Sequence, residues 1–212
     1  MNPRDRGFIH RWLDSAFGAG SRAPRAQVEC RRQGWGALQF GQGIAGSPLC
    51  LHGRTYERGL GTHAPSEIVV RLPRPARRFL ALAGVDDNPH VRANGAAPGR
   101  MEFAVETDGI ARWRSRPLGV AAAPAAVDVE LGGAWEFTLR VREVNDNIGY
   151  AHADWADARV ILDDGTEIPV GSSQEERRLC QTPPLDFRYG GKPAAEVLTA
   201  WTCVSESIPA PA

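Results

Sequence analysis

Hydrophobic and polar residues alternate along several short segments between residues 28 and 162. The alternation is clearest in three hydrophobic sets: Met101, Phe103 and Val105; Val127, Val129 and Leu131; and Phe137, Leu139 and Val141. Successive side chains on a β-strand point to opposite faces of the sheet. Each set therefore predicts a strand with one buried face and one face in water.

Two further segments, residues 67–72 and 78–84, are more continuously apolar, which predicts strands nearer the centre of the domain. Asp108-Gly109 and Asp164-Gly165 are typical of tight turns, because glycine accepts the positive φ angle that such turns need. Together with residues 34–51 and 158–162, about eight strands result, and no part of residues 28–162 keeps a helical spacing of apolar residues. The pattern predicts an all-β fold, an antiparallel β-sandwich.

Both ends of the chain lack this alternation. Residues 1–25 combine a short predicted helix, residues 8–17, with a linker rich in Gly, Ala and Pro. Residues 163–212 gain prolines and contain one predicted helix, residues 193–201. We therefore expect an N-terminal appendage (1–25), a β-sandwich domain (26–162) and a C-terminal linker or start of a further domain (163–212), both tails being irregular.

The charges of the chain disfavour two classes of partner. The 25 Lys and Arg residues balance the 25 Asp and Glu residues, so no net positive field attracts a nucleic-acid backbone. No apolar run reaches the ~20 residues of a membrane-spanning helix, and the first residues lack the apolar stretch of a signal peptide. We expect neither a nucleic-acid nor a membrane partner.

The four cysteines are widely spaced and include no Cys-x-x-Cys pair, which disfavours a zinc ribbon or a thioredoxin-like site. They are Cys30, Cys50, Cys180 and Cys203. Two disulfides in any of three connectivities, or four buried thiols, agree equally with the sequence.

Three polar clusters are predicted to lie on loops at strand ends, on the rim of the sandwich. They are residues 56–67, which contain Gly-Leu-Gly-Thr-His; residues 84–88, Gly-Val-Asp-Asp-Asn; and residues 145–157, which contain Asn-Asp-Asn and His-Ala-Asp-Trp-Ala-Asp. Sugar hydroxyl groups pair with such polar side chains, while the apolar face of a sugar ring prefers an aromatic surface. Trp35, Trp113 or Trp155 can supply that surface.

The predicted carbohydrate-binding residues are Glu57, Arg58, Thr62, His63, Asp86, Asp87, His152, Asp154 and Trp155. Each has a structural alternative. An Asp at a strand end often bonds its own backbone, and a Trp or His in a sandwich often lies in the core.

Calcium is the metal to consider, because it binds the hard oxygen ligands that these clusters contain. The predicted ligands of a structural calcium are Asp86, Asp87, Asn88 and Asp146, although no segment resembles an EF-hand loop. Zinc is disfavoured, since His63 and His152 lack the spacing of a zinc motif.

No sequence motif of an enzyme active site is present. The chain has no Gly-x-Ser-x-Gly elbow, no glycine-rich phosphate loop and no catalytic cysteine signature. Hydrolysis of a glycosidic bond needs two carboxylates at a defined separation, which this sequence does not establish. We therefore expect a chain without catalytic activity of its own.

Taken in order, the clusters resemble the NPCBM-type modules, also called family 51 carbohydrate-binding modules. The resemblance covers about residues 26–162. It is carried by Gly-Trp-Gly (34–36), Tyr-Glu-Arg-Gly-Leu-Gly-Thr-His-Ala (56–64), Gly-Val-Asp-Asp (84–87), Phe-Ala-Val with Asp-Gly (103–109) and His-Ala-Asp-Trp-Ala-Asp-Ala (152–158). This succession is more specific than any one of its parts.

The resemblance implies a jelly-roll β-sandwich that recognises galactose-type or related glycans, commonly with a structural calcium. It also implies fusion to a glycoside hydrolase and a secreted or cell-envelope location, and residues 187–198 resemble the lead-in to an α-galactosidase-like catalytic domain. We therefore expect a non-catalytic module that targets an attached glycoside hydrolase to a glycan. The alternative is a protein-interaction or structural β-sandwich that packs on a hydrolase domain, which an exposed apolar patch on one sheet face would favour.

Overall fold

The computed structural model describes residues 25–93, 100–144, 148–172, 188–189 and 192–193. The chain divides into two units, Pro24–Arg178 and a second one made of Met1–Ala23 and Leu179–Ala212. In the second unit, β12 (Arg188–Tyr189) and β13 (Lys192–Pro193) pair antiparallel. The helices predicted at residues 8–17 and 193–201 lie outside the described residues, apart from Pro193 at the end of β13.

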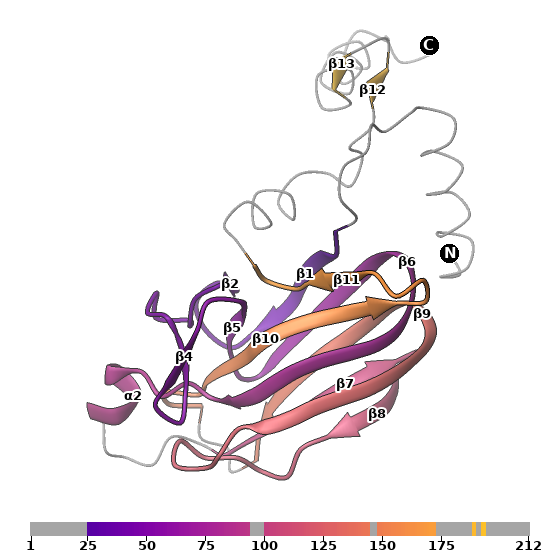
Figure 1. The fold of residues 1–212 in the computed structure, drawn as a ribbon. Helices are drawn as coiled ribbons and strands as arrows, with labels where there is room; N and C mark the ends of the chain where they lie inside the picture. The colour runs from indigo at the N-terminus through magenta and orange to yellow at the C-terminus, as the bar shows by residue number, and fades with distance from the viewer. Residues whose placement is uncertain (1–24, 94–99, 145–147, 173–187, 190–191, 194–212) are drawn as a thin grey trace, which may run out of the picture. The chain divides into compact units, whose positions relative to one another are not determined.

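The first unit is an antiparallel β-sandwich, as the alternation predicts (Figure 1). Its strands are β1 (Gln27–Gln33), β2 (Gln39–Phe40), β3 (Leu49–Leu51), β4 (Arg54–Tyr56), β5 (Gly59–His63), β6 (Ser66–Val85), β7 (Met101–Thr107), β8 (Ile110–Arg114), β9 (Ala125–Glu143), β10 (His152–Leu162) and β11 (Glu167–Pro169). One short helix, α2 (Pro89–Ala93), follows β6. The part of the chain that the structure describes contains no helix long and apolar enough to span a bilayer.

Two long strands, β6 and β9, contribute to both layers of the sandwich (Figure 1). The first part of β6 pairs with β1 and its last part pairs with β10, while β9 pairs with β6 over most of its length. The register shifts between Arg71 and Ala76 and again between Ala76 and Arg78. The second shift lies opposite Gly132 and Gly133, whose φ angles are 61° and 76°. Glycine adopts this left-handed region without steric cost, so the pair lets the ribbon bend. The sequence predicts two separate strands within β6 and two within β9, whereas the structure joins each pair into one long strand.

The core lies between the two layers. All nine residues of the three alternating hydrophobic sets are buried, as the sequence predicts. Phe79 of β6 packs on Phe137 of β9 with ring centroids 4.8 Å apart, although these residues are not strand partners. Their contact joins the two layers.

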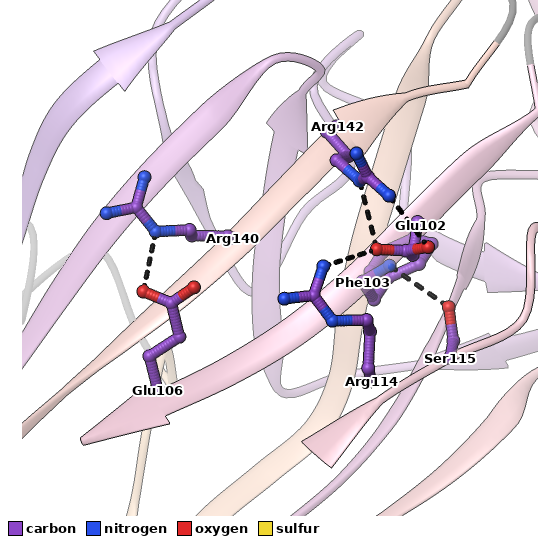
Figure 2. A network of polar contacts seen from close by, with 7 residues as sticks. All are labelled: Glu102, Phe103, Glu106, Arg114, Ser115, Arg140 and Arg142. Carbon is purple, nitrogen blue, oxygen red and sulfur yellow. Dashed lines mark hydrogen bonds and ion pairs between the residues drawn. The ribbon is translucent and has the colours of Figure 1, made fainter. Parts of the chain in front are cut away.

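The outer face formed by β7, β8 and β9 carries paired arginine and glutamate side chains (Figure 2). Arg142 binds Glu102 through two N–H groups at 2.9 and 3.1 Å, and Arg114 donates to the same carboxylate at 2.7 Å. Arg140 donates to Glu106 at 2.7 Å. Hydrogen bonds from Arg142 and Arg114 lower the pKa of Glu102. This face is therefore charged rather than apolar.

The sandwich continues past Leu162, where the sequence interpretation ended it. After the turn at Asp164 and Gly165, β11 pairs antiparallel with β10 and buries Ile168. Cys30 and Cys50 are free thiols in this unit, whereas Cys180 and Cys203 lie outside the described residues. A disulfide that includes Cys30 or Cys50 is therefore not part of this structure.

Candidate functional site

The three polar clusters of the sequence meet because their segments are neighbouring strands. β10 lies between β5 and β6 and is antiparallel to both. This arrangement makes His152 the direct cross-strand partner of His63, and the backbone N–H of Asp86 donates to the carbonyl of His152 at 3.0 Å. One end of the sandwich therefore collects residues that are far apart in the sequence.

Two of these segments are strands, not the predicted loops. Residues 59–63 form β5 and residues 152–157 belong to β10, and nearly all of them are buried. Gly61 explains the error: a Cβ atom at this position would lie 2.2 Å from the carbonyl oxygen of Gln42. The glycines that suggested a loop are required because another part of the backbone packs directly against the strand.

A surface cleft of about 610 Å³ opens above the two histidines. Its lining residues are Gly34, Trp35, Ala45, His63, His90, Ile148, Gly149, Tyr150 and His152. Trp35 is 59% exposed, and its ring is parallel to that of His152 at a centroid distance of 6.3 Å. An indole ring at the mouth of a cleft offers the flat apolar surface that the face of a sugar ring prefers.

The backbone at Gly34 determines where Trp35 lies. The N–H of Gly34 donates to the carbonyl of His63 at 3.3 Å. A Cβ atom on Gly34 would lie 2.3 Å from the carbonyl oxygen of Ala64, so only glycine allows the chain to pass so close. The next residue, Trp35, is thereby held beside the histidine pair, with its ring 5.9 Å from that of His63.

Burial favours the neutral form of both cross-strand histidines. Burial lowers the pKa of His63. Burial, followed by the neighbouring His63 and His90, lowers the pKa of His152 to about 4. The cleft therefore presents neutral imidazole rings to a ligand.

Below the histidines lies a buried polar group formed by Asp86, Asn88 and Asp154. Asn88 donates to Asp86 at 2.9 Å, and Asp154 accepts a bond of 3.2 Å from the backbone N–H of Cys50. One oxygen atom of each carboxyl group, Oδ1, is buried without a hydrogen-bond partner. Burial raises the pKa of Asp86 to about 6 and raises that of Asp154 well above its ordinary value, the charge of Asp86 adding to the second shift.

The other predicted binding residues lie outside the cleft. Glu57 borders a different surface hollow, and exposed Arg58 forms an ion pair of 3.5 Å with Asp157. Thr62 is buried and donates to Gln33 at 2.8 Å. Asp87 accepts from the N–H of Gly53 and pairs with Arg92, which lowers its pKa.

Trp155 is fully buried and belongs to the core. Its ring meets that of Phe103 edge-on at 5.4 Å and lies 6.3 Å from Phe79. A ring without exposed surface cannot stack on a sugar, so Trp155 is not part of the candidate site. Trp35, another of the three tryptophans that the sequence offers, lines the cleft instead.

Three of the predicted calcium ligands fit a metal poorly. Asp87 is engaged by Gly53 and Arg92, and the side-chain oxygen of Asn88 accepts the N–H groups of His90 and Val91. Asp86 alone keeps an unpartnered oxygen. Among the described residues, no group of three or more His, Cys, Asp or Glu side chains can hold a metal ion. Asp146, the fourth predicted ligand, lies outside the described residues, as do Asn145 and Asn147.

Sequence reasoning missed His90, Ile148 and Tyr150 as lining residues. Ile148 and Tyr150 follow the predicted Asn-Asp-Asn segment directly, and Tyr150 has a positive φ angle of 55°. The available signal was an Ile and a Tyr beside a polar segment, because large hydrophobic side chains that gather at a surface often mark a binding site.

Comparisons with known proteins identify the family of this chain. The model of the NPCBM/NEW2 domain matches residues 23–161. A putative endo-alpha-N-acetylgalactosaminidase of Renibacterium salmoninarum is 33% identical over 134 residues, which are 60% of this chain and 8% of that protein. The alpha-1,3-galactosidase B of Akkermansia muciniphila is 30% identical over 140 residues, 64% of this chain and 17% of that protein. The chain thus spans only a small part of the length of these relatives.

Solved structures share the fold. The CBM51 of Clostridium perfringens GH95, in complex with methyl-galactose, superposes with a TM-score of 0.53 and 25% identity over 62% of this chain and 92% of that one. The CBM51-2 and INT domains of Clostridium perfringens ZmpB give a TM-score of 0.57 at 23% identity over 66% of this chain and 30% of that one. Since the family model matches well over half of the sequence and covers the strands around the cleft, the chain belongs to the NPCBM/NEW2 domain family.

Proposed function

We propose that this chain is a non-catalytic carbohydrate-binding module that holds a galactose-type sugar in the cleft beside Trp35. One observation carries the proposal. Of the five exposed large hydrophobic residues among those described, three line this one cleft: Trp35, Ile148 and Tyr150. Apolar groups gathered over neutral polar groups match a sugar ring, which has an apolar face and a rim of hydroxyl groups.

The relatives support the same proposal. The CBM51 with methyl-galactose bound is 25% identical to this chain, and both curated relatives carry the names of glycosidases. We infer that the module serves to keep an attached glycoside hydrolase near its glycan, in a protein that acts outside the cell. The protein-interaction alternative has less support, because the outer sheet face drawn in Figure 2 is charged, not apolar.

We expect Trp35→Ala to weaken binding of a methyl galactoside by about tenfold to a hundredfold, because it removes the exposed aromatic surface. That range corresponds to about 1.4–2.8 kcal/mol. Isothermal titration calorimetry on the purified chain measures it, with circular dichroism to establish folding. Ile110→Ala is the matched control, since Ile110 is 60% exposed but does not line the cleft.

Unchanged affinity in folded Trp35→Ala protein would place the sugar elsewhere. A glycan array on which the wild-type chain retains no sugar would contradict the function itself. Turnover of an aryl galactoside by the purified chain would show that it is an enzyme.

Calcium is tested in the same titration by adding a chelator. Because Asp86, Asp87 and Asn88 form no complete site, we expect the affinity and the thermal unfolding midpoint to stay unchanged. A fall in either quantity, restored by added calcium, would assign calcium to a site that draws on residues beyond these three, such as Asp146.

A further inference from the structure

The tautomer of His63 follows from its backbone contact. Its Nδ1 atom lies 2.7 Å from the carbonyl oxygen of Ala64. A carbonyl oxygen can only accept a hydrogen bond, so Nδ1 must carry the proton. Because burial keeps the ring neutral, Nε2 carries a lone pair and acts as an acceptor.

The tautomer of His152 is fixed in the opposite sense by Asn88. The side-chain oxygen of Asn88 accepts the backbone N–H groups of His90 and Val91 at 3.0 and 3.1 Å, which orients the amide. Its NH₂ group therefore faces Asp86 and Nδ1 of His152, each at 2.9 Å. An amide NH₂ group can only donate, so Nδ1 of His152 is the acceptor and the ring proton sits on Nε2.

The second nitrogen of each ring is open to the cleft. No described hydrogen bond uses Nε2 of His63 or of His152, and neither atom is among the buried polar atoms that lack a partner. Both rings line the cleft, and their centroids are 5.6 Å apart. Hydroxyl groups of a single sugar ring can therefore meet both nitrogens.

We propose that this pair of oppositely protonated histidines makes the cleft selective for neutral sugars, a specificity that rests on the proposed function. A hydroxyl group both donates and accepts, so it satisfies the acceptor of His63 and the donor of His152 alike. A carboxylate can only accept and leaves the lone pair of His63 unpaired, and an ammonium group can only donate and leaves the N–H of His152 unpaired. The lining contains no Asp, Glu, Lys or Arg side chain to offset either mismatch.

Asn88 acts as a positioning residue in this arrangement. It contacts Nδ1 of His152, and its amide group forms hydrogen bonds with Asp86, His152 and the first turn of α2. Its contribution to specificity is to hold the proton of His152 on the nitrogen that faces the cleft.

Nitrogen-15 NMR of the histidine rings tests the tautomers directly. At pH 7, long-range ¹H–¹⁵N spectra of wild-type protein should show His63 protonated on Nδ1 and His152 protonated on Nε2. Assignment uses His63→Phe and His152→Phe, and if either variant fails to fold, ¹³C-edited correlations in wild-type protein replace it. Two rings with the same tautomer, or two protonated rings, would overturn the proposal.

A panel of three related ligands tests the specificity. Calorimetry compares galactose with galacturonic acid and with galactosamine, because each of these two ligands differs from galactose in one group. We expect the charged ligands to bind at least tenfold more weakly, since an unpaired buried polar group costs about 1–3 kcal/mol. Equal affinity for galacturonic acid would overturn this inference and leave the proposed function intact. Failure to bind any sugar, with opposite tautomers observed, would instead overturn the proposed function and this specificity with it.

Discussion

Replacement of Trp155 by Ala is expected to lower the free energy of unfolding by about 3–5 kcal/mol. The Trp155 ring has no exposed surface and contacts the rings of Phe103, Phe79 and Trp113. Removal of so large a side chain from between the two layers leaves a cavity that the surrounding strands cannot close. A loss of this size is a large fraction of the 5–15 kcal/mol that stabilises an ordinary domain.

Urea denaturation followed by circular dichroism measures this loss, and Trp35→Ala is the control. Both variants delete an indole ring, but Trp35 lies at the surface, so its free energy of unfolding should change by no more than about 0.5 kcal/mol. Trp155→Phe should recover part of the stability. A Trp155→Ala protein as stable as Trp35→Ala would mean that this ring does not hold the layers together.

The sequence predicts the sandwich well because a strand with one buried face shows alternating hydrophobic and polar residues in its own sequence. The alternation in residues 101–105, 127–131 and 137–141 reports directly which side chains meet the core, and all of those side chains are buried. The resemblance also located the neighbourhood of the cleft, since His63 and His152 both line it.

The part of the site that was mispredicted depends on tertiary contacts. Residues 59–63 contain two glycines and were interpreted as a loop, but close packing against Gln42 makes them a buried strand. Trp35 and Trp155 are the same residue type, and no local pattern separates the exposed ring from the buried one. Burial of Trp155 follows only from the position of β10 between β5 and β6.

The burial of Asp154, and with it the ionisation state of its carboxyl group, also depends on tertiary contacts. The sequence suggested a carboxylate that meets a sugar, whereas the structure buries this side chain under the cleft beside Asp86 and Cys50. Burial of a carboxyl group disfavours its ionised form, so the group keeps its proton at a pH where an exposed Asp has lost it. The Asp154 side chain has no exposed surface, so it does not reach a ligand in the cleft.

The free energy of unfolding of Asp154→Asn, relative to that of wild type, is expected to increase as the pH rises above about 4. In the unfolded chain Asp154 ionises near pH 4, whereas in the folded chain burial and the charge of Asp86 raise its pKa well above that value. Between these two values the folded protein binds one more proton than the unfolded chain, so the free energy of unfolding falls with rising pH, by about 1.4 kcal/mol per unit for one group. An amide does not titrate, so the variant escapes this loss while it keeps an oxygen to accept the N–H of Cys50.

Urea denaturation of both proteins at pH 5, 6, 7 and 8 measures the difference. His63, His152 and Cys50 are present in both proteins, so their contributions largely cancel when the two curves are subtracted. Asp86 interacts with Asp154, so the difference reports the ionisation of this pair of carboxyl groups. Asp154→Ala is the control for the hydrogen bond, because it removes the acceptor of the Cys50 N–H and should be less stable than Asp154→Asn at every pH. A wild-type minus variant difference that stays constant from pH 5 to 8 would show that Asp154 is already ionised in the folded chain, and the two buried carboxyl groups would then need a positive partner.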